Sequence, residues 1–164
     1  MDVKLDSVDK KILAALIDNS KIQSKELSRK LRIHPNTLLQ RLKKLEGAGV
    51  LVKYSAVVDF PKVDRRLQAL IFLDVDMEKA WEDALRPMAR LPEVQSFILI
   101  TGDHDVLVIA RVKDELHLAA LLRKLQATKV VLHTTTHLIV DYYAYPHDYN
   151  PFRDEWRFDD DRKR

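Results

Sequence analysis

The stretch Ser24–Gly49, SKELSRKLRIHPNTLLQRLKKLEGAG, contains the pattern from which the fold is predicted. Pro35 suits the first position of a helix, because it lacks an N–H that would have no partner there. Gly47 and Gly49 suit the end of that helix, where the chain must turn away. A preceding helix that begins at the first serine, a favourable N-cap, leaves only residues 32–34 between the two helices. This short connection is typical of a helix-turn-helix.

The predicted second helix has an apolar side and a polar side. Its leucines recur at the spacing i, i+4, i+7 and predict a buried stripe of Leu38, Leu42 and Leu45. At 3.6 residues per turn, amide and ammonium groups lie on the opposite side of this helix. These groups, with the flanking hydroxyl, bind base edges and phosphates. We therefore predict that this side binds double-stranded DNA.

Charge supports this prediction. Residues 21–49 contain eight lysines and arginines against two glutamates, and residues 1–60 carry a net charge of +5 against −2 for residues 61–164. The predicted helix that begins at Ser24 buries Leu27 and Leu31 and exposes basic residues. A lysine-rich helix pair that is merely solvated is the alternative interpretation. The candidate DNA-binding residues are Lys25, Arg29, His34, Asn36, Thr37, Gln40, Arg41, Lys43 and Lys44.

Two residues depart from the usual pattern of this motif. His34 lies where a serine or threonine would cap the helix better, and Arg32 lies in the turn, where glycine would be easier. Arg41 is expected to bridge the edge of the core and a phosphate.

Composition limits the other functions. The chain has 164 residues, 46% of them hydrophobic, which is enough for a buried core in two small domains or one medium one. It has no cysteine, which excludes disulfides and thiolate metal sites. The amino-terminal end lacks an apolar signal core and no apolar run reaches membrane-spanning length. We expect a cytoplasmic protein without a membrane partner.

The remaining N-terminal segments complete a three-helix unit. Asp6 can cap a helix whose first turn contains Asp9. That helix buries Val8, Ile12, Leu13 and Leu16. The β-branched stretch VLVKYSAVVDF, residues 50–60, predicts a strand, and Pro61 with the charged residues 62–66 predicts a linker.

The second half predicts the order strand, helix, strand, strand, helix, strand. The strands are predicted at 67–77, 94–101, 106–112 and 130–140, and the helices at 78–91, with Trp81 and Leu85 inward, and at 115–126. Pro87 should kink or restart the first of these helices, and Gly102 to Asp105 form the turn of a hairpin. This order is the split βαβ, or ferredoxin-like, arrangement.

The predicted strands are apolar on both faces. Residues 70–73, 97–100 and 106–110 are continuous apolar runs, whereas a sheet with one solvated face should alternate. Two helices cover only one face, so we expect the other to meet the same sheet of a second subunit. A dimer would present two recognition helices to half-sites about 34 Å apart.

Several ordered motifs, from about Leu5 to Val140, resemble the Lrp/AsnC, or feast/famine, transcription regulators of bacteria and archaea. They are LDxxDxxIL from Leu5 to Leu13, Arg41-Leu42 and Leu45-Glu46 before Gly49-Val50, PEV at 92–94, and TGxxD from Thr101 to Asp105. The resemblance implies an α+β protein in which a winged-type helix-turn-helix domain is joined to a ferredoxin-like βαββαβ (RAM/ACT-like) dimerisation domain. Such dimers often assemble further, into octamers or similar. The predicted boundaries are 1–50, a connecting strand and linker at 51–66, the βαββαβ domain at 67–142 and an aromatic-rich tail at 143–164.

The resemblance also implies an effector site, usually for an amino acid, at a subunit boundary. A glycine turn lets the backbone approach a ligand, and an aspartate can bind an ammonium group. A plain hairpin turn whose aspartates bond their own backbone is the alternative. The candidate effector-binding residues are Thr101, Gly102, Asp103, His104, Asp105, Thr134 and Thr136.

Other chemistry has less support. His133 and His137 lie about 13 Å apart along an extended strand, too far to share a metal ion. We expect no metal, no cofactor and no catalytic residues, since no nucleophile–base pattern or P-loop is present. Siroheme decarboxylases have a similar two-module layout, and His104, His133 and His137 with the tail aromatics would line a tetrapyrrole pocket in that alternative. A third interpretation is an architectural protein that coats DNA with little sequence preference.

The C-terminal tail does not fit the family pattern. Residues 142–164 contain seven of the aromatic side chains, and Pro146 and Pro151 argue against regular structure there. We predict that the tail packs on its own or a neighbouring subunit, with residues 159–164 loose, and that deleting 145–164 weakens assembly.

Overall fold

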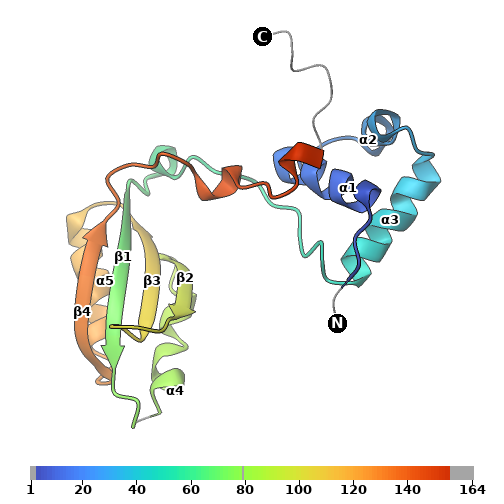
Figure 1. The fold of residues 1–164 in the computed structure, drawn as a ribbon. Coiled ribbons are helices and arrows are strands. Elements are labelled where there is room, and N and C mark those ends of the chain that lie inside the picture. Colours follow the sequence, from blue (N-terminus) through green and yellow to red (C-terminus); the bar gives the residue numbers. More distant parts are fainter. Residues whose placement is uncertain (1–2, 79, 156–164) are drawn as a thin grey trace. The chain divides into compact units, whose positions relative to one another are not determined.

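The computed structural model describes residues 3–78 and 80–155, which form two compact units (Figure 1). The first unit consists of residues 3–57 together with the C-terminal segment from 144 to 155. The second unit is Val58–Tyr143. The chain therefore passes between the units twice, once after Val57 and once after Tyr143.

The first unit is the predicted set of three helices, α1 (Ser7–Asp18), α2 (Ser24–Leu31) and α3 (Pro35–Gly47). Its core contains the leucine stripe of α3, with Leu38 and Leu45 fully buried against Ile12 and Leu27. Asp6 caps α1 in a capping box with Asp9, as the sequence predicts. The helix-turn-helix of the sequence prediction is confirmed.

The turn between α2 and α3 shows how two unusual residues are accommodated. Arg32 adopts the left-handed conformation with φ 55°, at the C-cap of α2 where glycine would be easier. His34 is the N-cap of α3, and its Nδ1 accepts a hydrogen bond from the Asn36 N–H at 3.2 Å. The imidazole therefore serves in place of the expected serine or threonine hydroxyl.

The strand predicted over residues 50–60 is wrong. Residues 52–59 are extended without strand pairing, and a single turn of 3₁₀ helix, η1 (Phe60–Val63), follows. A β-branched stretch becomes a strand only where another strand accepts its hydrogen bonds, and here its side chains face solvent, with Val52 83% and Val57 65% exposed.

The C-terminal segment packs on the first unit, as one of the two predicted arrangements requires. It forms two single turns, η3 (Pro146–Asp148) and η4 (Arg153–Glu155), and Phe152 packs against the helical core. Tyr143 and Tyr149 remain exposed. Trp156, Phe158 and the end predicted to be loose, 159–164, lie outside the described residues.

The second unit is a four-stranded antiparallel sheet in the order β2-β3-β1-β4. The elements are β1 (Leu67–Val75), α4 (Trp81–Leu85), β2 (Val94–Leu99), β3 (Val106–Val112), α5 (Glu115–Gln126) and β4 (Val131–Leu138). Pro87 ends α4, and a 3₁₀ turn, η2 (Met88–Arg90), restarts the helix. The predicted split βαβ topology is confirmed.

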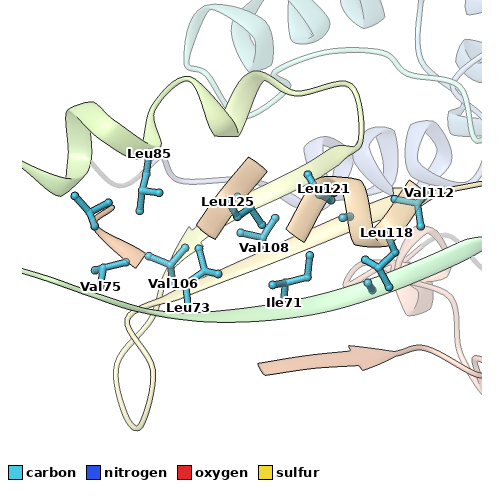
Figure 2. Packing of buried hydrophobic residues seen from close by; sticks show 13 residues of the cluster. Ile71, Leu73, Val75, Leu85, Val106, Val108, Val112, Leu118, Leu121 and Leu125 are labelled. Carbon is cyan, nitrogen blue, oxygen red and sulfur yellow. The ribbon is translucent and has the colours of Figure 1, made fainter. Parts of the chain in front are cut away.

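The core of this unit lies between the sheet and its helices. Figure 2 shows Ile71, Leu73 and Val108 of the central strands facing Leu121 and Leu125 of α5. All five side chains are fully buried. This face of the sheet is the one that the two helices cover.

The opposite face of the sheet is also apolar. Leu70 and Phe72 of β1 and Leu107 and Ile109 of β3 point away from the helices and remain half-buried. The continuous apolar runs of the sequence therefore belong to two faces, one covered and one open. No helix within the described residues is long and apolar enough to span a bilayer.

Candidate functional site

The outer side of α3 is exposed as predicted. Asn36, Thr37, Gln40 and Lys43 all face solvent. Within residues 3–78 and 80–155, their side chains have neither a hydrogen bond nor an ion pair to the protein. A row of polar groups without internal partners has its donors and acceptors available to another molecule. On α2, Lys25 and Arg29 are exposed in the same way.

Two of the residues predicted to contact DNA are bonded to α1 and to its N-cap, which is the core-side half of the bridge expected for Arg41. Arg41 Nη1 lies 2.7 Å from both Asp6 Oδ2 and Asp9 Oδ1, and Lys44 Nζ lies 3.1 Å from Asp9 Oδ2. The Asp9 side chain is completely buried, whereas that of Lys44 is half-exposed. Arg41 therefore holds α3 on α1, and its other guanidinium nitrogens have no partner elsewhere in the described residues.

The ionisation of this cluster follows from its geometry. Burial alone would raise the pKa of Asp9, but hydrogen bonds from Arg41 and Lys44 outweigh it and hold the pKa below the usual value. The hydrogen bond from Arg41 likewise lowers the pKa of Asp6. Both carboxylates are charged at neutral pH, so the position of α3 depends on a charged network.

Leu39 was not among the residues predicted to contact DNA. This leucine is 48% exposed, whereas Leu38 and Leu45 of the same helix are fully buried. It lies three residues after Asn36 and four before Lys43, so it adjoins both on the outer side of α3. The signal was present in the sequence, because Leu39 falls outside the i, i+4, i+7 stripe.

The TGxxD turn of the sequence connects β2 and β3. Gly102 has φ +119°, a conformation that other residues rarely adopt. Asp105 is bonded to its own chain, because its carboxylate accepts the Val75 N–H at 2.8 Å and its N–H donates to the Leu73 carbonyl at 3.1 Å. Thr101 and Asp103 are exposed. Asp105 thus fixes the turn against the end of β1, while Asp103 remains available.

His104 points to the open face of the sheet. Its Nδ1 lies 2.7 Å from Asp74 Oδ1, and its ring is 5.1 Å from the Phe72 ring. On the other side of Phe72, the His137 ring is edge-on at 5.7 Å. An aromatic and imidazole cluster, His104–Phe72–His137, therefore lies on this face.

Thr134 and Thr136 lie on the opposite, helix-covered side of the sheet from His104. Thr134 pairs with Leu73 and Thr136 with Ile71, whose side chains point into the core. Thr134 Oγ1 accepts a hydrogen bond from Gln126 Nε2 at 3.0 Å and lines a shallow surface hollow with residues 131–133. Of the candidate effector residues, His104 therefore lies at the open face, whereas Thr134 and Thr136 lie on the helix-covered face.

The second unit also contains a buried carboxylate, Glu93, which was not among the candidate site residues predicted from the sequence. Glu93 Oε1 lies 3.1 Å from His117 Nε2 and 3.0 Å from Lys124 Nζ, and its Oε2 is buried without a partner in the described residues. Burial alone would raise the pKa of Glu93, but its own backbone N–H and the hydrogen bonds from Lys124 and His117 outweigh burial and hold the pKa below its usual value. Glu93 therefore attaches α5 to the start of β2.

Comparison with known families matches both units. Residues 5–52 match winged helix-turn-helix DNA-binding domains, and residues 68–146 match the Lrp/AsnC ligand-binding domain. The leucine-responsive regulatory protein of Haemophilus influenzae is 34% identical over 112 residues, which are 67% of this chain and 68% of the relative. The transcriptional regulator AzlB of Bacillus subtilis is 30% identical over 116 residues, 70% of this chain and 74% of the relative.

Solved structures give the same result. A transcriptional regulator of Neisseria meningitidis, crystallised as a complex with L-methionine, superposes with a TM-score of 0.82 at 30% identity, over 87% of this chain and 94% of that chain. AsnC of E. coli superposes with a TM-score of 0.80 at 22% identity, over 87% and 97% of the chains, and shows the shared fold.

Proposed function

The chain belongs to the Lrp/AsnC family of transcriptional regulators, and from this premise we propose that it reads operator DNA with the outer side of α3. One observation carries the proposal: Asn36, Thr37, Gln40 and Lys43 are exposed together without partners in the described chain. Asparagine and glutamine amides pair with the N6 and N7 of adenine in the major groove. Lys43, with Lys25 and Arg29 on α2, supplies phosphate contacts.

His34, Arg41 and Lys44 have a different role in this proposal. They place α3 rather than read bases, since their side chains are bonded to the Asn36 N–H, Asp6 and Asp9. Lys44 remains half-exposed, so its ammonium group can approach a phosphate while it stays near Asp9.

The test is selection of binding sites from random DNA, followed by gel-shift titration of the selected duplex at two salt concentrations. A regulator enriches one sequence, and its affinity falls steeply with salt, because each phosphate contact releases counterions. Binding without enrichment would identify an architectural DNA-coating protein instead. Absence of binding at low salt would contradict the proposal.

The open face of the sheet is proposed to be the dimer interface. Leu70, Phe72, Leu107 and Ile109 form a continuous apolar surface there, of the kind that soluble proteins cover with a partner. A second copy supplies the same apolar surface through a two-fold axis. Mass by light scattering tests this, with Ile109→Asp as the disrupting variant and Leu116→Asp, on the outer side of α5, as its control.

A small effector, an amino acid or a similar molecule, is proposed to bind at the β2–β3 turn. The Neisseria relative is a complex with L-methionine, and the exposed Asp103 beside Gly102 offers a carboxylate to an ammonium group. Thermal-shift measurements with each amino acid, on wild type and Asp103→Ala, test the site. A ligand whose stabilisation survives Asp103→Ala unchanged binds elsewhere.

An enzyme related to siroheme decarboxylases is the second candidate. The His104–Phe72–His137 cluster is the observation that favours it, because imidazoles are axial ligands of tetrapyrroles. The exposed polar side of α3 favours the regulator. Adding a tetrapyrrole and recording the Soret band separates them: a shift abolished by His104→Ala and His137→Ala would support the enzyme.

A further inference from the structure

The C-terminal segment lies along one side of α1. Lys10, Ala14 and Asp18 are spaced four residues apart and so form a single stripe on this helix. Asn150 Nδ2 donates to the Ala14 carbonyl at 3.0 Å and to Asp18 Oδ1 at 2.7 Å, and Glu155 Oε1 lies 3.3 Å from Lys10 Nζ. The segment therefore runs antiparallel to α1, and Figure 1 shows its last turn beside that helix.

The stripe has the features of a specific contact surface. Ala14 is fully buried, and its small side chain lets the segment approach the helix backbone. Asp18 lies at the C-terminal end of α1, where the helix dipole disfavours an anion, and the hydrogen bond from the Asn150 amide partly offsets this. Asn150 Oδ1 also accepts the Phe152 N–H at 3.1 Å, which turns the Phe152 ring toward the helical core.

The segment gives the molecule a second short connection between its units. In the second unit, Tyr142 donates a hydrogen bond to Gln68 Oε1 at 2.7 Å, and Asn150, the first contact on α1, follows eight residues later. Eight residues span at most about 29 Å. The other connection, from Ser55 to Phe60, spans at most about 18 Å.

Both connections leave the second unit at the same place, and both lead to the recognition helix. The Ile139 N–H donates to the Gln68 carbonyl at 2.9 Å, which joins the end of β4 to the start of β1. In the first unit, the segment contacts α1, and α1 holds α3 through Asp9 and Arg41. The segment therefore links the end of β4 covalently to a site on α1, and α1 in turn holds α3.

We propose that the Lys10–Ala14–Asp18 stripe is a docking surface for the chain's own segment 150–155, and that docking limits the positions of α3 relative to the sheet. The inference rests on the proposed DNA-binding function. Within the described residues, the contacts of the segment on α1 are the hydrogen bonds of Asn150, the Lys10–Glu155 ion pair and the Phe152 ring, a small set that allows the segment to release and dock again. In the docked state the dimer presents its two recognition helices at a narrow range of separations, and release widens that range.

The first experiment tests docking in the full chain. Because the protein contains no cysteine, the Lys10→Cys, Glu155→Cys double variant can be treated with a short bis-maleimide. We expect rapid cross-linking within one chain, read by mass spectrometry as one chain plus one reagent with both thiols consumed. The same pair combined with Asn150→Ala and Phe152→Ala should react several-fold more slowly. Equal rates, or a product of twice the mass, would overturn docking on the same chain.

The second experiment tests the consequence for DNA. Duplexes carry the selected half-sites with one to five base pairs inserted between them. Between its best and its worst spacing, wild type should lose about tenfold in affinity, and the cross-linked protein should lose at least as much. The Asn150→Ala, Phe152→Ala variant should lose about threefold or less. An unchanged spacing profile in the undocked variant would overturn the inference, whereas absence of DNA binding by every form would overturn the proposed function.

A charge exchange guards against a folding artefact. Lys10→Glu should repel Glu155 and widen the spacing profile, and the double variant Lys10→Glu, Glu155→Lys should restore the wild-type profile. Circular dichroism must show the same helix content in all three proteins. Failure of the exchange to restore the profile would contradict an ion-paired dock.

Discussion

At α3 most of the residues expected to bind a ligand point away from the protein, whereas at the β2–β3 turn several of the expected residues are bonded to it. Asn36 and Gln40 have no side-chain partner among the described residues. Asp105 accepts the Val75 N–H, and His104 contacts Asp74. A motif can therefore mark a ligand site or the bonds that build a turn, and only the contacts distinguish the two.

Arg41 and Gln40 are neighbours in α3, but only Arg41 is bonded to the protein. Replacing Arg41 should therefore give the largest change in stability. Arg41→Ala should destabilise the first unit by about 2–3 kcal/mol, because the buried Asp9 loses its shortest ion pair and keeps only Lys44 and the Asp6 N–H. Gln40→Ala should change stability by about 0.5 kcal/mol or less. Amide hydrogen exchange of α1 and α3 in both variants measures this, and equal protection would contradict the assigned roles.

Both units should be less stable in acid than at neutral pH. The lowered pKa values of Asp9 and Glu93 stabilise the folded protein fully above their unfolded pKa of about 4. This stabilisation is lost as the pH falls through the folded pKa, with a slope of up to about 1.4 kcal/mol per pH unit for each carboxylate.

Urea unfolding between pH 2 and 7 checks the acid effect. Asp9→Asn should flatten the acid side of the curve for the helical signal, and Glu93→Gln should flatten it for the sheet. If both variants keep the wild-type slope, these carboxylates are not the groups that couple stability to pH.

In the β2–β3 turn, Asp105 and Asp103 should differ in the same way, one supporting the fold and the other binding the effector. Asp105→Ala should cost the sheet unit about 1–2 kcal/mol, because the Val75 N–H loses its acceptor. Asp103→Ala should be nearly neutral for stability but weaken effector binding. Thermal unfolding with and without ligand measures both, and a neutral Asp105→Ala would show that the turn does not depend on this carboxylate.

Leu39 gives the smallest effect. We expect it to contact a thymine methyl group, since it is exposed beside Asn36 and Lys43. Replacing that thymine by uracil should weaken wild-type binding about fourfold, the contribution of one buried methyl group. With Leu39→Ala, the same replacement should have no effect. A loss that persists in the variant would assign the methyl contact to another residue.

Much of the fold could be predicted because its signals are local. The spacing of Leu38, Leu42 and Leu45 marks the buried side of α3, and Pro35 and Gly47 mark its ends. The split βαβ order follows from apolar runs separated by helical periodicity. The strand at 50–60 could not be predicted correctly, because composition does not say whether another strand is available to pair with it.

The partners of residues that lie far apart in the sequence could not be predicted. Arg41 was expected at the edge of the core, but local patterns do not say that its partner is Asp9, 32 residues away. Thr134 and Thr136 were assigned to the site of His104, but the strand register places them on the other face. The aromatic content of the tail predicted that it packs on a subunit, but local patterns do not say that Phe152 packs on the helices of its own chain.

The account depends above all on the exposed side of α3, and one affinity measurement tests it most directly. The Gln40→Ala, Lys43→Ala double variant is titrated against the selected duplex beside Gln23→Ala, Lys53→Ala, a control that removes the same two side-chain types from other exposed positions of the first unit. The account predicts a loss of about a hundredfold or more for the first variant, and less than about threefold for the control. Equal affinities of the two variants for the duplex would contradict it.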